Sequence, residues 1–296
     1  MGLIMKKIPT LLIVSVLLFV FFTIGIAQDK IILDAKYYPP LVEAGNVAIM
    51  FLGGSDGGMP NYNVEKYTAK GYPCFKVGYF STENTPDHLE MIPLEYFEKA
   101  IKSFKSQPEV GDKKIVVFGG SKGGELVLLL ASRYKQIAGV IARVPSSVIF
   151  QGIGGPLKTS SWSYKGQPVP FVPYYKPFDY SKVVNGQWIE LYELSLTQTE
   201  AVEKATIKVE NINGPVLLLS GKEDAVWPSS KMGEMIIKRL KENKFPHWYK
   251  HFVYKNAGHS FNENDLMAGS TKEGNKRARI DSEQRIFEFL NRLSVE

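Results

Sequence analysis

The fold is decided by the stretch Ile115-Val116-Val117-Phe118-Gly119-Gly120-Ser121-Lys122-Gly123-Gly124-Glu125. Its first four residues are β-branched or aromatic, which is typical of a buried strand. Glycines then mark a sharp turn, and the apolar run 126–131 that follows is typical of the core face of a helix. The stretch therefore predicts a strand, a tight turn with Ser121 at its tip, and a helix.

Gly119, Ser121 and Gly123 form a G-x-S-x-G pattern. This is the layout of the nucleophile elbow of α/β-hydrolases, in which a strained turn holds the serine oxygen above the edge of the sheet. Glycines flank the serine because a Cβ on either side would collide with the adjoining strand and helix. The alternative is an ordinary glycine-rich turn between a strand and a helix, since three fixed residues also recur by chance. The strand before and the helix after favour the elbow.

Apolar runs of strand length alternate with amphipathic segments of helix length along most of the chain. Such alternation predicts a parallel sheet covered by helices on both faces. We therefore expect an α/β protein with the α/β-hydrolase fold. The predicted strands cover residues 47–52, 73–79, 115–118, 138–144, 216–220 and 252–254, and the predicted helices include 64–70, 89–106 and 281–293.

Residues 147–213 interrupt this alternation. The segments Ser160–Tyr164 and Phe171–Phe178 are rich in aromatic residues and proline and have no clear periodicity. A long irregular insertion in a compact enzyme often forms a lid or a binding loop. A simple surface excursion is the alternative, but it would leave many aromatic side chains in water. We therefore predict a lid-like insertion or a pocket wall.

Residues 1–27 have the features of a secretory signal peptide. Two lysines precede an apolar run over 8–26, and the small residues Gly25 and Ala27 precede a cleavage point. The run is nearly long enough to span a bilayer, so an uncleaved membrane anchor is the alternative. We expect export to the periplasm or the medium, with residues 28–296 forming one catalytic domain. Membrane contact is expected only if the segment stays uncleaved.

The composition limits the range of partners. The formal net charge is +6, and the lysines are scattered among acidic residues rather than clustered, which argues against a nucleic-acid partner. Cys74 is the only cysteine, so the chain cannot form an intrachain disulfide. We expect a small-molecule partner.

A serine nucleophile needs a base, and the base needs a third group to orient it. In α/β-hydrolases these groups follow the order serine, acid, histidine along the chain. Of the four histidines, His259 is the predicted base because it follows the last predicted strand. His88 precedes the serine, whereas His247 and His251 flank or enter the last strand and are expected to pack or lie at the surface.

Two carboxylates follow the strand at 216–220. Asp224 is the preferred acid because it lies in a G-x-x-D loop that begins at Gly221, and Glu223 is the fallback. The alternative is that both side chains only solvate a turn or cap a helix that begins near Pro228. Ser121, Asp224 and His259 occur in the required order, each just beyond a predicted strand.

An oxyanion hole needs backbone N–H groups that point at the developing negative charge. We expect one from Lys122, the residue after the nucleophile, and one from Gly54 or Ser55 in the glycine-rich loop at 53–58. A phosphate-binding loop is the alternative, but the G-x-G-x-x-G pattern is not matched. The Lys122 side chain is expected either to assist an anionic substrate or to be solvated at the helix start.

Several segments resemble one known family. Ser121–Leu126, Gly221–Ser230 and Ala257–His259 resemble the C-terminal catalytic domain shared by acyl-CoA thioester hydrolases and bile acid-CoA:amino acid N-acyltransferases. Leu94–Ala100 and Ser160–Gly166 are similar to further segments of that domain. The resemblance extends over nearly all of the chain that follows the signal segment.

The resemblance implies that Ser121 is the nucleophile, Asp224 the orienting acid and His259 the base. It implies an acyl thioester such as an acyl-CoA as substrate. The acyltransferase branch uses a cysteine nucleophile, so a serine favours hydrolysis. The chemistry needs no metal and no organic cofactor.

Two alternatives remain for the function. One is an exported carboxylesterase that acts on oxyesters, which the export segment favours because coenzyme A is a cytosolic metabolite. The other is an inactive hydrolase-fold binding protein, and the presence of the serine, the acid and the histidine argues against it.

Overall fold

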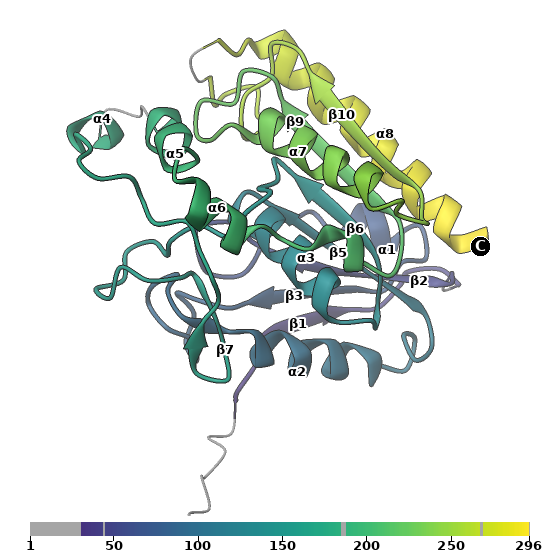
Figure 1. Cartoon of the computed structure of the whole chain (residues 1–296). Helices are drawn as coiled ribbons and strands as arrows, with labels where there is room; N and C mark the ends of the chain where they lie inside the picture. Colours follow the sequence, from purple (N-terminus) through teal and green to yellow (C-terminus); the bar gives the residue numbers. More distant parts are fainter. Residues whose placement is uncertain (1–30, 44, 185–187, 267–268, 296) are drawn as a thin grey trace, which may run out of the picture. The chain divides into compact units, whose positions relative to one another are not determined.

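A seven-stranded sheet with the strand order β1-β3-β2-β5-β6-β9-β10 organises the chain in the computed structural model (Figure 1). The structure describes residues 31–43, 45–184, 188–266 and 269–295, so the predicted signal peptide lies outside the described residues. β1 is antiparallel to β3, and the other neighbours in this sheet are parallel. The strands are β1 (Asp34–Tyr38), β2 (Val47–Leu52), β3 (Cys74–Gly78), β5 (Lys114–Gly120), β6 (Ile137–Arg143), β9 (Val216–Gly221) and β10 (Tyr249–Tyr254).

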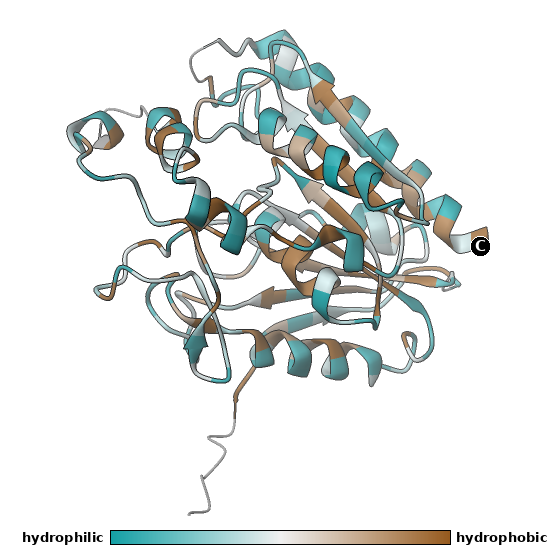
Figure 2. Ribbon diagram, in the orientation of Figure 1, coloured by the Kyte–Doolittle hydropathy of each residue, from teal (hydrophilic) through white to brown (hydrophobic). Residues whose placement is uncertain are grey.

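The strands form where the sequence has continuous apolar runs. Every residue of β2 and of β9 is buried. A strand needs such a run when helices cover both faces of its sheet. In Figure 2 the central strands are largely hydrophobic, whereas hydrophilic residues colour much of the outer helix surfaces.

Helices cover both faces, as the α/β-hydrolase fold requires. On one face, Phe289 and Leu293 of α8 (Lys272–Val295) belong to one buried cluster with Phe118 of β5. This cluster also includes Tyr67 of α1 (Glu65–Thr68). On the other face, Phe104 stacks on Phe75 of β3 with ring centroids 5.0 Å apart. That face carries α2 (Leu94–Lys105), α3 (Lys122–Arg133) and α7 (Ser229–Glu242).

The insertion between β6 and β9 has secondary structure of its own. Its β7 (Trp162–Tyr164) pairs with β8 (Gln167–Pro168) and with β4 (Ile92–Pro93), which makes a second, three-stranded sheet. The insertion continues through α4 (Ser181–Val184), α5 (Ile189–Ser195), α6 (Thr199–Ala205) and the 3₁₀ helix η1 (Val209–Asn211). Because β4 belongs to this sheet, the insertion is attached to the segment that precedes α2.

This attachment corrects the predicted start of α2. The sequence predicted a helix from residue 89, but α2 begins at Leu94. Leu89 bridges to Ile153, and Pro93 has an extended backbone with φ −72° and ψ 130°. Residues 89–93 therefore pair with the insertion instead of extending the helix.

The predicted start of the last helix, at residue 281, was also wrong. α8 begins at Lys272, and its first turns are mostly polar, so they carry no apolar periodicity. Gly274 in the first turn packs so closely on the loop after β10 that a Cβ there would lie 1.9 Å from the Asn256 carbonyl oxygen. The beginning of α8 is thus fixed by contact with that loop rather than by its own sequence pattern.

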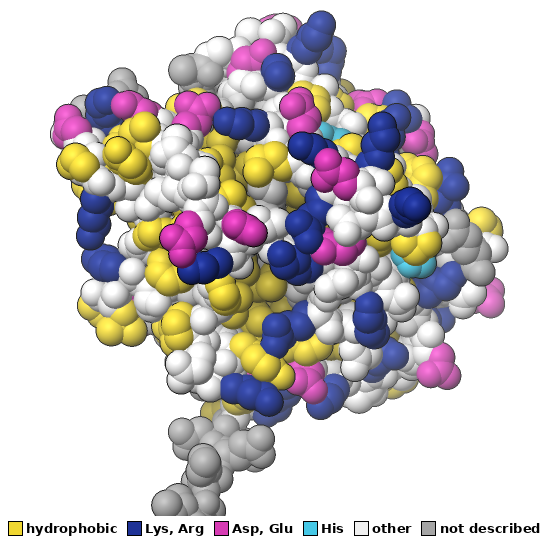
Figure 3. Space-filling view, in the orientation of Figure 1, with side chains coloured by type: hydrophobic (Ala, Val, Ile, Leu, Met, Phe, Trp, Pro, Cys, Tyr) yellow, Lys and Arg dark blue, Asp and Glu magenta, His cyan; other side chains and the backbone are white. Residues whose placement is uncertain are grey.

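The described surface mixes both signs of charge. Figure 3 shows lysine and arginine side chains interspersed with aspartate and glutamate on the face in view. Within the described ranges, no helix combines the length and the apolar character needed to cross a membrane.

Candidate active site

The turn after β5 has the geometry of a nucleophile elbow. Ser121 has φ 58° and ψ −126°, which places a non-glycine residue in a strained region of backbone space. A Cβ on Gly119 would lie 2.2 Å from the Gly123 carbonyl oxygen, and a Cβ on Gly123 would lie 2.3 Å from that of Gly53. Both glycines are therefore required, because the first turn of α3 contacts β5 and the loop after β2 directly.

The structure pairs Asp224 with His259. The His259 Nδ1 lies 2.9 Å from each carboxylate oxygen of Asp224. Asp224 is buried and also accepts hydrogen bonds from the N–H groups of Val226 and Trp227 and, at 2.6 Å, from the Ser229 hydroxyl. These bonds hold the carboxylate in one orientation.

Glu223, the fallback acid, is placed differently. Its N–H donates to the Ala257 carbonyl, and its buried Oε2 has no hydrogen-bond partner among the described residues. The hydrogen bonds of His259 to a carboxylate are both with Asp224. The geometry therefore favours Asp224 over Glu223.

The loop that carries His259 is held by the beginning of α8. The Gly258 N–H donates to the Asn275 side-chain oxygen at 2.8 Å, and the Asn275 amide donates to the Asn262 carbonyl at 2.8 Å. Asn275 is fully buried. Sequence reasoning missed Asn275, because a polar residue in a polar helical turn gives no signal of burial.

The histidine at the last strand packs away from this loop. His251 lies on β10, and its Nε2 is 2.9 Å from the Ser220 hydroxyl. Burial lowers the pKa of His251 to about 4. Its imidazole lies under α7, where a Cβ on Gly233 would come within 2.4 Å of the ring.

Ser121 and His259 lie at the same edge of the sheet. Their side chains are not hydrogen-bonded to each other in the described part of the chain. The Ser121 N–H donates to the Arg143 carbonyl of the neighbouring strand β6, at 3.0 Å. The carbonyl of the next residue, Val144, accepts a hydrogen bond from the Trp227 ring nitrogen at 3.1 Å. The Trp227 ring in turn meets the His259 ring edge-on, with the ring centroids 6.1 Å apart. Catalytic hydrogen bonds are often long before substrate binds.

Gly54 is the loop residue that lies against the elbow. A Cβ on Gly54 would be 3.3 Å from the Ser121 Cβ and 3.9 Å from its Oγ. The Tyr79 hydroxyl donates to the carbonyl of Gly53 at 2.6 Å, which orients this peptide segment. The N–H of Lys122 opens α3, so it has no carbonyl one turn earlier in the helix. Gly54, Ser55 and Lys122 remain the predicted oxyanion donors.

Both expectations for the Lys122 side chain, contact with an anionic substrate and exposure to solvent, were wrong. It neither reaches toward a substrate nor lies in solvent, because it is buried and its Nζ lies 2.7 Å from Oε1 and 2.9 Å from Oε2 of Glu125. Burial raises the pKa of Glu125 and lowers that of Lys122, and the ion pair between them opposes both shifts. The pair lies in the first turn of α3, directly behind the elbow.

Glu125 also fixes the insertion to α3. Its carboxylate accepts from the Trp162 ring nitrogen at 2.8 Å and from the Phe150 N–H at 3.2 Å. Sequence reasoning gave Glu125 no role, because both of these partners come from the distant insertion. The one available signal was its place at the end of the S-K-G-G-E run that begins at Ser121. That run alone does not predict a buried acid, because the partners of the carboxylate belong to the insertion.

Aromatic residues connect the insertion to the acid loop. Phe150 and Tyr192 lie within 6.0 and 5.5 Å of the Trp227 ring, and Trp227 in turn meets His259. Phe150, Tyr192 and Trp227 belong to one buried cluster that also contains Val148. The insertion therefore supplies an apolar wall close to the Asp224–His259 pair. Whether it moves as a lid remains a prediction.

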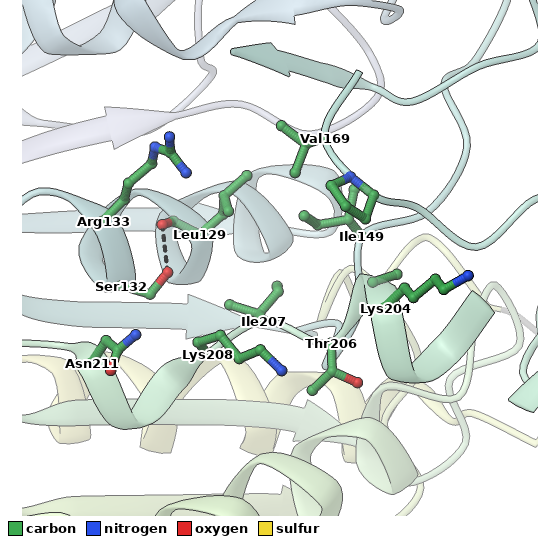
Figure 4. Close-up of a pocket in the computed structure, with 12 residues that line it drawn as sticks. Leu129, Ser132, Arg133, Ile149, Val169, Lys204, Thr206, Ile207, Lys208 and Asn211 are labelled. Carbon is green, nitrogen blue, oxygen red and sulfur yellow. Dashed lines mark hydrogen bonds between the residues drawn. The ribbon is translucent and has the colours of Figure 1, made fainter. Parts of the chain in front are cut away.

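Residues of the insertion line parts of two cavities. One of about 170 Å³ is bounded by Asp224 and Ser229 and by Ile189 of α5. Another, of about 210 Å³, is shown in Figure 4, and its lining includes the apolar Leu129 and Ile207 and the cations Arg133, Lys204 and Lys208. None of the sequence-predicted site residues lines the second cavity. Within the described ranges, no group of three or more His, Cys, Asp or Glu residues could hold a metal ion.

The profile of the family "BAAT / Acyl-CoA thioester hydrolase C terminal" matches residues 92–263, which is more than half of the chain. The chain belongs to this family. The match contains the elbow, the Asp224 loop and His259.

Curated relatives in the family have thioesterase names. Human acyl-coenzyme A thioesterase 1 is 31% identical over 188 residues, which cover 63% of this chain and 42% of the relative. Mouse acyl-coenzyme A thioesterase 5 is 25% identical over 261 residues, which cover 82% of this chain and 59% of the relative. The chain thus spans about two fifths to three fifths of these relatives.

Solved structures confirm the α/β-hydrolase fold. The acylaminoacyl peptidase of Pyrococcus horikoshii superposes with a TM-score of 0.56 at 18% identity, over 85% of this chain and 38% of the peptidase. Acetyl xylan esterase 1 of Thermoanaerobacterium gives a TM-score of 0.50 at 19% identity, over 88% of this chain and 79% of the esterase. At this level of sequence identity the two structures support the fold alone.

Proposed function

We propose that this protein is a serine hydrolase that cleaves acyl thioesters through an acyl-enzyme on Ser121. The observation that carries the proposal is the Asp224–His259 pair, which lies at the same sheet edge as the strained Ser121. Membership of the thioester hydrolase family and the names of the relatives support the thioester substrate.

The roles follow from the hydrogen bonds. With Nδ1–H donated to Asp224, the other ring nitrogen of His259 is left unprotonated, so it accepts the proton of the Ser121 hydroxyl as the oxygen attacks the carbonyl carbon. The N–H groups of Lys122 and of Gly54 or Ser55 stabilise the oxyanion. His259 then returns the proton to the leaving thiolate.

Water completes the cycle. His259 removes a proton from a water molecule, which attacks the acyl ester on Ser121, and the acid is released with the serine restored. Asp224 stabilises the imidazolium in both half-reactions. Each proton transfer therefore uses groups of this chain and water.

The second candidate is an exported carboxylesterase. The signal-like segment at 1–27 favours it, since an exported enzyme would not meet acyl-CoA. For both candidates we also propose that the protein is exported to the periplasm or the medium.

A substrate panel tests the proposal. Purified protein would be assayed on hexanoyl-CoA, S-ethyl thiohexanoate and 4-nitrophenyl hexanoate, with Ser121→Ala as the control. We expect turnover of the thioesters that Ser121→Ala abolishes. A strong preference for the oxyester would favour the carboxylesterase, and no turnover of any substrate would favour an inactive binding protein.

A further inference from the structure

A positively charged side chain lies next to the elbow and has no role in the mechanism above. Arg143 ends β6 and is the register partner of Gly120 on β5. Its carbonyl accepts the N–H of Ser121 at 3.0 Å. The backbone thus places Arg143 directly beside the proposed nucleophile.

The Arg143 guanidinium occupies the space next to Gly120. A Cβ on Gly120 would lie 3.4 Å from the Arg143 Nε, 3.4 Å from its Nη2 and 3.3 Å from the Tyr62 hydroxyl oxygen. The guanidinium therefore stands where the side chain of the residue before Ser121 would otherwise lie. Arg143 as a whole is half-buried, so part of the residue reaches the solvent.

The charge of Arg143 is not balanced by a described residue. No Asp or Glu within the described ranges forms an ion pair with it, and its buried Nε has no hydrogen-bond partner there. The described group in contact with the guanidinium is the Tyr62 ring, 5.9 Å from its central carbon, and burial raises the pKa of Tyr62, so that residue stays neutral. Elsewhere at the site, Lys122 forms an ion pair with Glu125, and the Asp224 carboxylate is hydrogen-bonded to His259.

A guanidinium of this kind has a preferred ligand. Leaving a buried donor without a partner is unfavourable, and a carboxylate satisfies a guanidinium with short, parallel hydrogen bonds. The phosphates of coenzyme A do not fit this position, because the pantetheine arm separates them from the thioester. A carboxylate near the scissile bond does fit.

We propose that Arg143 is a specificity-determining residue that binds a carboxylate of the substrate close to the scissile carbonyl. The inference rests on Ser121 being the nucleophile of the proposed function. The carboxylate can belong to the acyl chain, as in a dicarboxylic monoester or monothioester, or to the leaving group.

Matched ester pairs test the inference. The neutral reference is 4-nitrophenyl hexanoate. Mono-(4-nitrophenyl) adipate carries a carboxylate on the acyl side, and 3-hexanoyloxy-4-nitrobenzoate carries one on the leaving group. The full chain would be compared with Arg143→Met and Arg143→Lys, and Arg133→Met at the far end of α3 serves as the matched control.

We expect Arg143→Met to lower the ratio of kcat/KM between one anionic ester and the neutral ester by about 10- to 100-fold. Arg143→Lys should keep part of the ratio, and Arg133→Met should leave it unchanged. The ester that responds identifies the side of the scissile bond that bears the carboxylate. If Arg143→Met changes neither ratio by more than twofold, the inference is wrong.

Two further measurements separate this result from failure of the proposed function. Labelling by a fluorophosphonate reports on the nucleophile without using the anionic esters. Calorimetric binding of adipate reports on Arg143 without catalysis, and adipamide, which carries no carboxylate, is its control. If the protein is not labelled but binds adipate through Arg143, the proposed function fails and the carboxylate site stands. If labelling is normal while adipate binding is absent or insensitive to Arg143→Met, the carboxylate site fails alone.

Discussion

The Nδ1 of His259 lies 2.9 Å from both carboxylate oxygens of Asp224, so this aspartate, and not its neighbour Glu223, orients the imidazole. We expect Asp224→Asn to lower kcat by roughly 10³- to 10⁴-fold, because an amide does not stabilise the imidazolium. Hydrolysis of 4-nitrophenyl hexanoate measures the loss. The matched control is Glu223→Gln, which should stay within a few-fold of the parent protein. A larger loss from Glu223→Gln than from Asp224→Asn would reverse the assignment.

The close contact of Gly123 predicts a steric requirement at the elbow. A Cβ there would lie 2.3 Å from the Gly53 carbonyl oxygen, so Gly123→Ala forces α3 away from the loop after β2. We expect a loss of about 3 kcal/mol in the free energy of unfolding, despite the higher helix propensity of alanine. Urea denaturation measures it. Gly45→Ala is the control, since nothing lies within 4 Å of a Cβ at Gly45. Equal stability of the two variants would contradict the packing described for the elbow.

The buried Lys122–Glu125 pair predicts non-additive stability effects. Glu125→Gln leaves the lysine charge buried without its counter-ion and should reduce the free energy of unfolding by about 3–5 kcal/mol. The double variant Lys122→Met, Glu125→Gln should recover part of that loss, because no charge is then buried. A double-mutant cycle in urea gives the coupling energy. Additive effects would show that the pair is not coupled.

The same carboxylate predicts a link between the insertion and α3. Trp162→Phe removes the ring N–H that donates to the Glu125 Oε1, which then keeps only its hydrogen bond from the Lys122 Nζ. We expect faster hydrogen exchange in residues 147–170 than in the parent protein, because the insertion loses an anchor. Exchange that is unchanged there would mean that the other contacts of the insertion hold it alone.

His251 predicts how the stability depends on pH. Burial lowers its pKa from 6.5 to about 4, so the unfolded chain binds this proton more readily than the folded chain does. The contribution to stability is therefore present above pH 6.5 and is lost as the pH falls toward 4, by about 2–3 kcal/mol. His251→Gln should lose less stability than the parent protein over that interval in urea titrations. Parallel curves for the two proteins would contradict the buried, neutral imidazole.

Much of the site could be predicted because its residues follow strands. The G-x-S-x-G pattern marks the end of β5, and Asp224 and His259 come just after β9 and β10. In a parallel sheet the carboxyl ends of strands share one edge, so order along the chain is enough to bring such residues together.

The rest depends on contacts between distant segments. Glu125 is held by Trp162 of the insertion, and Asn275 holds the Gly258 N–H from α8. No local sequence pattern predicts such pairs, since Glu125 and Asn275 are polar residues in helical turns whose sequence gives no sign of burial. Arg143 was missed for the same reason, because its position beside Gly120 follows from strand register and not from spacing along the sequence.

The proposed mechanism depends on Ser121 acting as a nucleophile activated by His259 and Asp224. Labelling of the purified protein with a fluorophosphonate, followed by peptide mass spectrometry, tests it most directly. We predict one adduct on the peptide that contains Ser121, no adduct in Ser121→Ala, and much slower labelling in His259→Ala. An adduct that maps to another residue, or labelling that survives Ser121→Ala, would show that Ser121 is not the nucleophile.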